Sequence, residues 1–98
     1  MPTYEVTERF RRDDWNQLSK DERKTFMQAV QEFVEDLASG RFRKGLRVRR
    51  VEGTDSVWEM TWEGGNGRAT FEFGPGIRPG ERHVIWRRVG GHAIFRKP

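Results

Sequence analysis

The sequence predicts an α+β fold in which two N-terminal helices pack on one face of a four- to five-stranded antiparallel sheet. Two observations lead to this fold class. Apolar residues recur at helical spacing in the first half, and they alternate with charged residues in the second half, as in strands with one buried face. The chain has 98 residues, the size of one domain, so we expect residues 1–98 to share a single core.

The first half predicts one strand followed by two helices. Residues 4–10 have the composition of a short strand, and Asp13 or Asp14 is suited to begin a short helix. A longer helix starts at Ser19, which precedes Glu22 with the spacing of a capping box. The apolar positions on one face of this helix are Phe26, Val30, Phe33 and Leu37. We expect that face to pack against the sheet.

The second half predicts four strands separated by glycine-rich turns and loops. The strands span residues 46–52, 57–63, 68–73 and 83–89. The last of them is apolar on both sides, which favours a position inside the sheet. A four-residue turn over residues 64–67 closes a hairpin between the second and third of these strands.

The turn over residues 64–67 also predicts the register of that hairpin. The predicted pairs on the covered face are Trp62 with Ala69, Met60 with Phe71, and Trp58 with Phe73. On the other face Glu59 would lie opposite Glu72, and opposed carboxylates repel each other. Two consecutive arginines follow in the adjacent strand, so we predict a β-bulge at Arg49–Arg50 that directs an arginine toward Glu59.

The charge of the chain favours an anionic partner such as nucleic acid. Lys and Arg number 19 and Asp and Glu number 15, for a formal net charge of +4. The absence of cysteine excludes disulfides and thiolate metal sites. No apolar run approaches the ~20 residues that span a membrane, and the N-terminus lacks the apolar core of a secretory signal. We therefore expect a soluble, cytoplasmic protein.

A basic stretch at the start of the sheet is a candidate RNA contact. Six of the ten residues in 41–50 are Lys or Arg, among them Arg47, Arg49 and Arg50. Guanidinium groups bind phosphate in a bidentate manner, which suits these three side chains to substrate binding. The alternative interpretation is a solvated connection whose charges neutralise acidic neighbours.

Two later strands supply further candidate arginines. Arg68 begins a strand on the polar face, where it is placed to clamp a phosphate; the alternative is a cross-strand ion pair with Glu63. Strand alternation predicts Arg87 on the face of His83 and Arg88 on the opposite face. Only one of these two arginines then serves the same site, and we assign Arg87 to substrate binding.

The two histidines suggest proton transfer in RNA cleavage. Imidazoles act as general base and acid when a ribose 2′-OH attacks the adjacent phosphate, a reaction that needs no metal or cofactor. His92 is the better placed, because Gly90 and Gly91 permit a sharp turn before it, and Phe95 beyond it is suited to stack on a base. The alternatives are that the histidines, His83 above all, are surface or cap residues and that Phe95 packs in the core.

The order of elements and several motifs resemble the RelE/ParE toxin superfamily of bacterial type II toxin–antitoxin modules. The order is a strand, two helices of which the second is longer, and several antiparallel strands. The motifs are Leu46-Arg47-Val48-Arg49-Arg50-Val51-Glu52-Gly53, Val57-Trp58-Glu59-Met60, Arg68-Ala69-Thr70-Phe71 and Trp86-Arg87-Arg88-Val89-Gly90-Gly91-His92-Ala93-Ile94-Phe95. The resemblance covers nearly the whole chain.

The resemblance implies a metal-independent endoribonuclease that cuts messenger RNA, often in the ribosomal A site, and a cognate antitoxin that restrains it. In RNA-cutting members, basic residues on the middle strands stabilise the phosphate. The matching residues here are Arg47, Arg49 or Arg50, and Arg68. A basic or imidazole residue near the end of the chain assists proton transfer, which matches His92, and a terminal aromatic ring stacks on the base, which matches Phe95.

The sequence also departs from the pattern of that superfamily. Arginines stand where lysines are frequent, which removes a possible general base of low pKa, so Glu59 is a further candidate as base or as an orienting residue. Phe95 lacks the hydroxyl group of a tyrosine. The alternatives are a member of the gyrase-inhibiting branch, which shares the fold without the catalytic residues, a binder of another partner protein, or a plain RNA-binding module.

Overall fold

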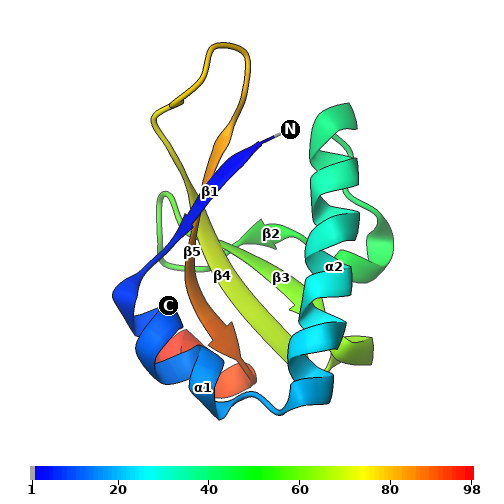
Figure 1. Cartoon of the computed structure of the whole chain (residues 1–98), viewed down its shortest axis with the longest axis vertical. Coiled ribbons are helices and arrows are strands. Elements are labelled where there is room, and N and C mark those ends of the chain that lie inside the picture. The colour runs from blue at the N-terminus through cyan, green and yellow to red at the C-terminus, as the bar shows by residue number, and fades with distance from the viewer. Residues whose placement is uncertain (1) are drawn as a thin grey trace.

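The structure, a computed structural model, describes residues 2–98 and has the predicted α+β composition. In chain order its elements are β1 (Thr3–Val6), the π-helical segment η1 (Phe10–Asp14), α1 (Trp15–Gln17), α2 (Lys20–Ser39), the 3-10 turn η2 (Lys44–Leu46), β2 (Arg49–Arg50), β3 (Trp58–Trp62), the 3-10 turn η3 (Glu63–Gly65), β4 (Gly67–Gly74), β5 (His83–Gly90) and the 3-10 helix η4 (His92–Arg96) (Figure 1).

The five strands form one mixed sheet in the order β1-β5-β4-β3-β2. The predicted antiparallel sheet is therefore wrong at one edge, where β1 runs parallel to β5 with Thr3 beside His83 and Val6 beside Trp86. A polar–apolar pattern predicts which face of a strand is buried but not the direction of its neighbour. The apolar β5 lies inside the sheet, between β1 and β4, as its sequence predicted.

The long helix α2 begins and ends as local sequence rules require. The Ser19 hydroxyl accepts a hydrogen bond from the Glu22 amide, and the Glu22 carboxylate accepts one from the Ser19 amide, so the predicted capping box is confirmed. Gly40 ends the helix with a φ of 77°, a conformation that favours glycine. The first helix starts earlier than predicted, because the Thr7 hydroxyl accepts a hydrogen bond from the Phe10 amide and turns the chain.

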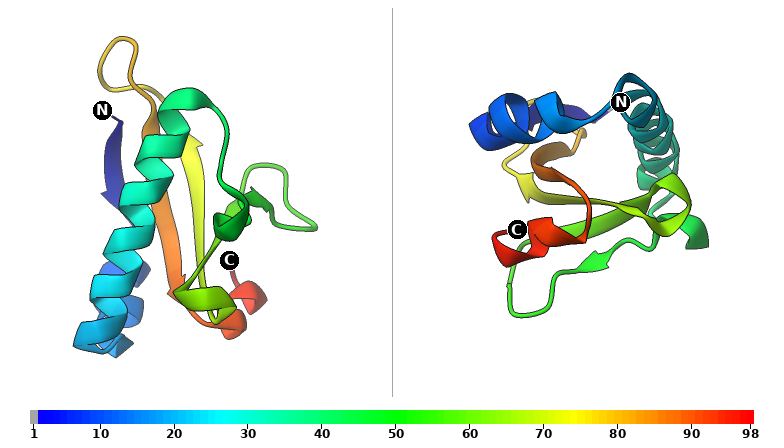
Figure 2. Two further views of the ribbon diagram at one scale, coloured as in Figure 1. Left: turned by 90° about the vertical axis from the view of Figure 1, so that its right-hand side faces the viewer. Right: turned by 90° about the horizontal axis from the view of Figure 1, so that it is seen from below.

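Aromatic rings from α2 pack against one face of the sheet. Phe33 is 1% exposed, and its ring lies 4.9 Å from that of Phe71 and 5.3 Å from that of Trp86, centroid to centroid. Phe26 makes similar edge contacts with Trp62 and Trp86. Views from two further directions place α2 along this face and η4 on the opposite side of the sheet (Figure 2).

The β3–β4 hairpin has a register two residues away from the predicted one. Its last pair is Trp62 with Gly67, so the four-residue connection covers residues 63–66 rather than 64–67. A Cβ atom on Gly67 would lie 2.4 Å from the Trp62 indole, so glycine alone allows this ring to cover the strand. Because the shift is even, every residue keeps its face. Glu59 now lies opposite Thr70, and the predicted clash of opposed carboxylates does not occur.

The predicted β-bulge at Arg49–Arg50 is wrong. Arg49 pairs with Glu59 and Arg50 with Trp58, without an inserted residue. The alternation is broken earlier, at Arg47, whose left-handed φ of 45° follows the η2 turn. This turn allows both Leu46 and Val51 to be buried without a bulge.

A bulge does occur in the pairing of β4 with β5. Thr70 pairs with Arg88 and the next residue, Phe71, pairs with Trp86, which leaves Arg87 as the extra residue. The prediction that Arg87 and Arg88 point to opposite faces is therefore wrong. Strict alternation cannot continue through an inserted residue, and both guanidinium groups donate hydrogen bonds to the C-terminal residues Lys97 and Pro98.

Candidate functional site

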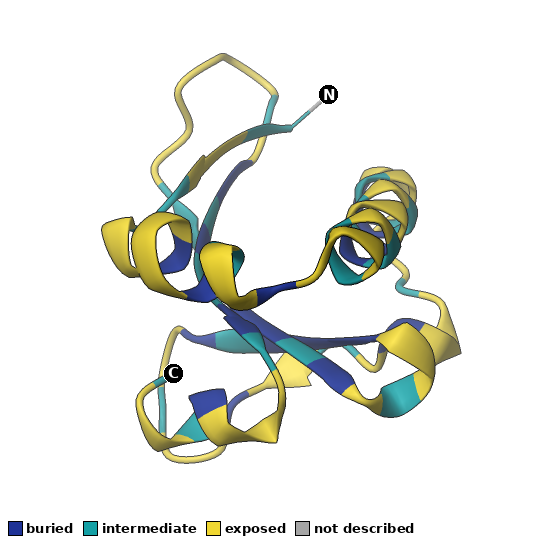
Figure 3. Cartoon of the chain, turned by 60° about the horizontal axis from the view of Figure 1, so that its bottom comes forward, coloured by how far each residue is buried: buried dark blue, intermediate teal, exposed yellow. Residues whose placement is uncertain are grey.

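The side of the sheet away from α2 carries the polar residues of the middle strands. Arg68, Thr70 and Glu72 alternate along β4 with the core residues Ala69 and Phe71. The helix η4 crosses the end of this face, on the side of the sheet away from α1 and α2 (Figures 2 and 3). This polar face, together with η4, is where the sequence placed its candidate site.

The structure brings Arg68 and His92 to the same end of the sheet. Arg68 pairs with Gly90, the last residue of β5, and His92 follows two residues later as the first residue of η4. Ile94 anchors η4 because its side chain is 4% exposed and lies against Gly90, where a Cβ atom would approach it to 3.1 Å. This contact brings η4 back against the end of β5.

His92 and Phe95 form a contacting pair on η4. Their ring centroids are 5.2 Å apart, and the rings meet at 86°, edge to face. His92 is exposed and Phe95 is half-buried, so one ring supports the other without burying it. This arrangement combines an accessible imidazole with a partly accessible aromatic face, which are the groups needed to move a proton and to stack on a base.

The Arg68 guanidinium is oriented by the hairpin beside it. Its Nη1 atom donates hydrogen bonds to the carbonyl oxygens of Gly65 at 2.5 Å and Gly67 at 2.9 Å. The predicted alternative, an ion pair with Glu63, is not formed among residues 2–98. Held by two neutral carbonyls, the guanidinium keeps its positive charge uncompensated by a carboxylate, as a phosphate ligand requires.

Glu59 is buried and paired, which does not suit a general base. It is 6% exposed, and its Oε1 atom accepts a hydrogen bond of 2.9 Å from Arg49 Nε. The predicted arginine beside Glu59 is thus confirmed and is Arg49. The Arg49 side chain remains 73% exposed, so the carboxylate orients a guanidinium that still faces solvent.

The other two arginines of the basic stretch lie at the edge of the sheet. Arg47 and Arg50 are both exposed, and Arg50 contacts the carbonyl of Asp55 at 3.5 Å. Arg50 belongs to β2, which is separated from β4 by β3, or about 10 Å at ordinary strand spacing, and Arg47 precedes β2 at the end of η2. Arg49 and Arg50 therefore lie in the same sheet as Arg68 but two strands away from it, and Arg47 lies just before that edge strand.

His83 is a structural residue rather than a second catalytic imidazole. It is 3% exposed, its Nδ1 atom lies 2.7 Å from the Thr3 hydroxyl, and its Nε2 atom lies 2.7 Å from Glu5 Oε1. These contacts join β1 to β5, so His83 is a buried link between strands rather than the surface or cap residue of the predicted alternative. His92 is consequently the one accessible imidazole of the two.

The C-terminal residues cover the middle of the polar face, which was not predicted from the sequence. The Pro98 carbonyl accepts hydrogen bonds from Thr70 Oγ1 at 3.0 Å and from Arg87 Nε at 3.1 Å. Arg87 also pairs with Glu72 at 3.3 Å, so this predicted substrate ligand has two partners within the fold. No sequence signal identifies these contacts, because they depend on the path of the chain after η4.

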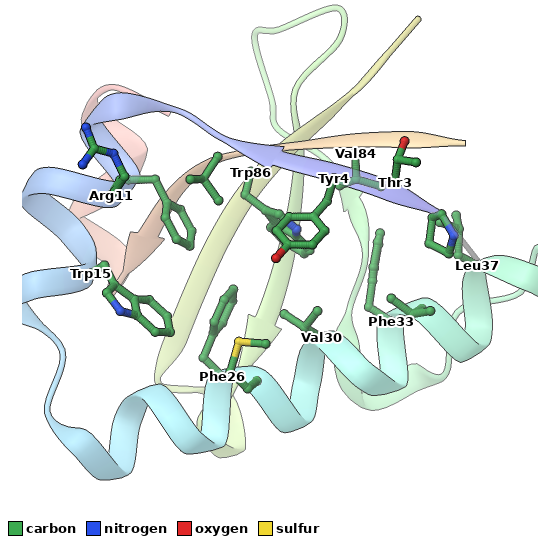
Figure 4. A pocket seen from close by; sticks show the side chains of 15 residues that line it. Thr3, Tyr4, Arg11, Trp15, Phe26, Val30, Phe33, Leu37, Val84 and Trp86 are labelled. Atoms are coloured by element: carbon green, nitrogen blue, oxygen red, sulfur yellow. The ribbon is translucent and has the colours of Figure 1, made fainter. Parts of the chain in front are cut away.

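An apolar groove lies on the helical side, away from these polar groups. It has a volume of about 350 Å³ and runs between β1, the first helical segment and α2 (Figure 4). Phe26, Phe33 and Trp86 lie within it, and Tyr4 and Met27 line it although they are 73% and 52% exposed. This groove was not predicted from the sequence, because the predicted core packing of α2 left no gap beside β1.

Comparisons with protein-family models, curated proteins and solved structures find no match to this chain. Within residues 2–98 there is no cluster of three or more His, Asp or Glu side chains able to hold a metal ion. In the same residues, no helix has both the length and the apolar character needed to cross a bilayer.

Proposed function

We propose that this protein is the toxin of a type II toxin–antitoxin module and that it cleaves messenger RNA without a metal ion, with a cognate antitoxin as its partner. The observation that supports cleavage is that Arg68 pairs with Gly90 at the end of the sheet where η4 begins, and that His92 and Phe95 of η4 contact each other. The order of elements on which the resemblance to RelE/ParE toxins rests is also the order in the fold. Because the proposed cutting takes place on messenger RNA at the ribosome, the proposal also implies that the protein acts in the cytoplasm.

The proposed chemistry is attack of a ribose 2′-OH on the adjacent phosphorus. The P–O5′ bond breaks, the attacking hydroxyl loses its proton, and the departing 5′-oxygen gains one, which leaves a 2′,3′-cyclic phosphate. His92 moves a proton in this reaction, and Arg68 stabilises the negative charge that develops on the phosphate. Phe95 stacks on a base, and the exposed arginines at positions 47, 49 and 50 hold the RNA farther along the sheet.

Induced expression tests this proposal, with and without the gene beside this one that would encode the antitoxin. Wild-type protein should arrest growth, and transcript ends should map to internal cuts that co-expression of the antitoxin suppresses. In purified form, His92→Ala should slow cleavage by about 10²–10⁴-fold and Arg68→Ala by about 10²–10³-fold. Arg96→Ala is the matched control, because Arg96 is exposed on the same η4 helix but has no assigned role. Normal growth with intact transcripts contradicts the proposal.

The apolar groove favours a second candidate function, in which the protein binds a partner without catalysis. Exposed apolar side chains that line a groove are characteristic of surfaces covered by another protein. In this candidate the protein inhibits DNA gyrase or another protein target. Growth arrest with DNA damage and intact messenger RNA would support it, whereas salt-dependent RNA binding without toxicity would indicate a plain RNA-binding module.

A further inference from the structure

A cationic pocket lies where four segments of the chain meet, and none of the predicted catalytic residues lines it. Its volume is about 390 Å³. The residues that line it are Thr7, Arg9, Thr54, Val57, Arg87, Arg88, Lys97 and Pro98. Four of these eight side chains are basic and none is acidic, although the residues come from four separate parts of the chain.

The β-bulge at Arg87 is the structural reason that two of the cations meet there. With regular pairing, the side chains of Arg87 and Arg88 would point to opposite faces; the inserted residue lets both line one pocket. Bulges that redirect side chains in this way are frequent beside functional sites. The bulge therefore brings the two guanidinium groups to one pocket.

The charge of the pocket exceeds what the fold neutralises. Arg88 is paired with Asp14 at 2.7 Å, and Arg87 is paired with Glu72 at 3.3 Å, so these two charges are compensated. Among residues 2–98, the side chains of Arg9 and Lys97 make no ion pair or hydrogen bond, and both residues are exposed. Two uncompensated cations thus face a pocket that already contains two guanidinium groups.

We propose that this pocket binds a phosphate group of the RNA backbone, as a subsite distinct from the end of the sheet that contains His92. This inference rests on the proposed function. The helix η4 joins the two places, because His92 begins it and Lys97 follows it, and five residues of 3-10 helix span about 10 Å. An RNA chain with one base stacked on Phe95 can therefore place a neighbouring phosphate in the pocket. Arg9 and Lys97 bind that phosphate.

The test is the salt dependence of binding to a short single-stranded RNA. Its 2′-hydroxyls are methylated so that it cannot be cleaved, and its dissociation constant is measured by fluorescence anisotropy at several salt concentrations. The double variant Arg9→Gln with Lys97→Gln should reduce the slope of log K against log salt by about 0.7 for each phosphate that the pocket no longer neutralises. The double variant Arg11→Gln with Lys24→Gln removes the same charge from exposed positions outside the pocket, and it should retain the wild-type slope.

The outcomes separate the subsite from the proposed function. An equal reduction of the slope in both double variants, or an unchanged slope in Arg9→Gln with Lys97→Gln, would overturn the subsite even if the wild-type protein cuts RNA. A pocket-dependent slope together with intact transcripts in cells would keep the subsite and overturn the nuclease. In a further outcome, inorganic phosphate raises the melting temperature of the wild type but not that of the Arg9→Gln, Lys97→Gln variant, while both proteins give the same slope with RNA. The pocket is then a small-anion site and the RNA proposal is wrong.

Discussion

At the scale of single residues, Asp14 has a role that its position in the sequence does not suggest. It is 7% exposed, and its carboxylate accepts two hydrogen bonds from Arg88, at 2.7 and 3.0 Å, and one from the Val89 amide at 3.1 Å. On the side of β5 that faces β1, Val89 has no neighbouring strand, since the pairing with β1 ends at Trp86. Asp14 therefore replaces a strand at that edge and fixes the arginine that follows the bulge.

We expect Asp14→Ala to reduce the free energy of unfolding by about 3–5 kcal/mol. The substitution leaves the Arg88 guanidinium, which is only 14% exposed, without its carboxylate and leaves the Val89 amide without an acceptor. Urea denaturation followed by far-UV circular dichroism measures the change. Asp13→Ala is the control, because Asp13 is the exposed neighbour and should cost little. Similar reductions in the two variants would show that Asp14 stabilises the helix start alone.

At the scale of elements, the β3–β4 hairpin is determined by a single close contact. The Trp62 indole lies directly over Gly67, and this contact coincides with the pair that closes the hairpin. Turn composition predicted a four-residue connection correctly, but it did not predict which four residues. The choice depends on where a large ring finds a position without a Cβ atom.

Gly67→Ala should destabilise the protein by about 1–3 kcal/mol, because the new methyl group would overlap the Trp62 ring in a packed core. The measurement is the midpoint of thermal or urea unfolding. Gly45→Ala is the matched control, since a Cβ atom there meets nothing within 4 Å, and it should be close to neutral. An unchanged midpoint for Gly67→Ala would mean that the hairpin can shift its register by two residues.

Ion pairs hold the connection between α2 and η2 in place. Arg43 donates to the Asp36 carboxylate through its Nε atom at 2.8 Å and its backbone amide at 2.8 Å, and it also pairs with Glu32 and Glu35. The side-chain hydrogen bond from Arg43, followed by the backbone one, lowers the pKa of Asp36 below its usual value of 3.8. These contacts attach the start of the basic stretch to the C-terminal half of α2.

The lowered pKa of Asp36 predicts an acid-sensitive contribution to stability. Because the folded-state pKa lies below the unfolded one, the contribution is complete above about pH 4 and is lost as the pH falls through the folded-state pKa. Arg43→Gln should therefore be less stable than the wild type at neutral pH, and the two should converge at acidic pH. Urea denaturation across this range measures the difference. Arg41→Gln, at an exposed position nearby, should show no such convergence. A difference that persists at low pH would mean that Arg43 acts through packing instead.

At the scale of the whole molecule, the sheet separates two surfaces with different chemistry. The helical side contains the aromatic core and the apolar groove (Figure 4), and the helix η4, which begins with His92, lies on the other side (Figure 2). A protein partner and an RNA can therefore occupy this molecule on opposite sides of one sheet. Under the proposed function, the antitoxin and the substrate need not compete for the same groups.

Much of the fold could be predicted because it follows from local patterns. The capping box at Ser19, the apolar stripe of α2 and the alternation in β3 and β4 each involve residues close in sequence, and each is observed. The candidate site was predicted in part for the same reason: a glycine pair before His92 and a strand start at Arg68 are local features. Arg87 and His83 were misjudged in role or direction because their surroundings come from distant segments.

The sequence by itself determined the α+β class, the start of the long helix, the buried face of each middle strand and the excess of positive charge, since spacing and composition suffice for these. Only the tertiary structure decided that β1 runs parallel to β5, that a bulge turns Arg87 and Arg88 toward one pocket, and that Asp14 is buried against Arg88, 74 residues away. Contacts at such separations depend on how whole elements pack, and no local pattern encodes them.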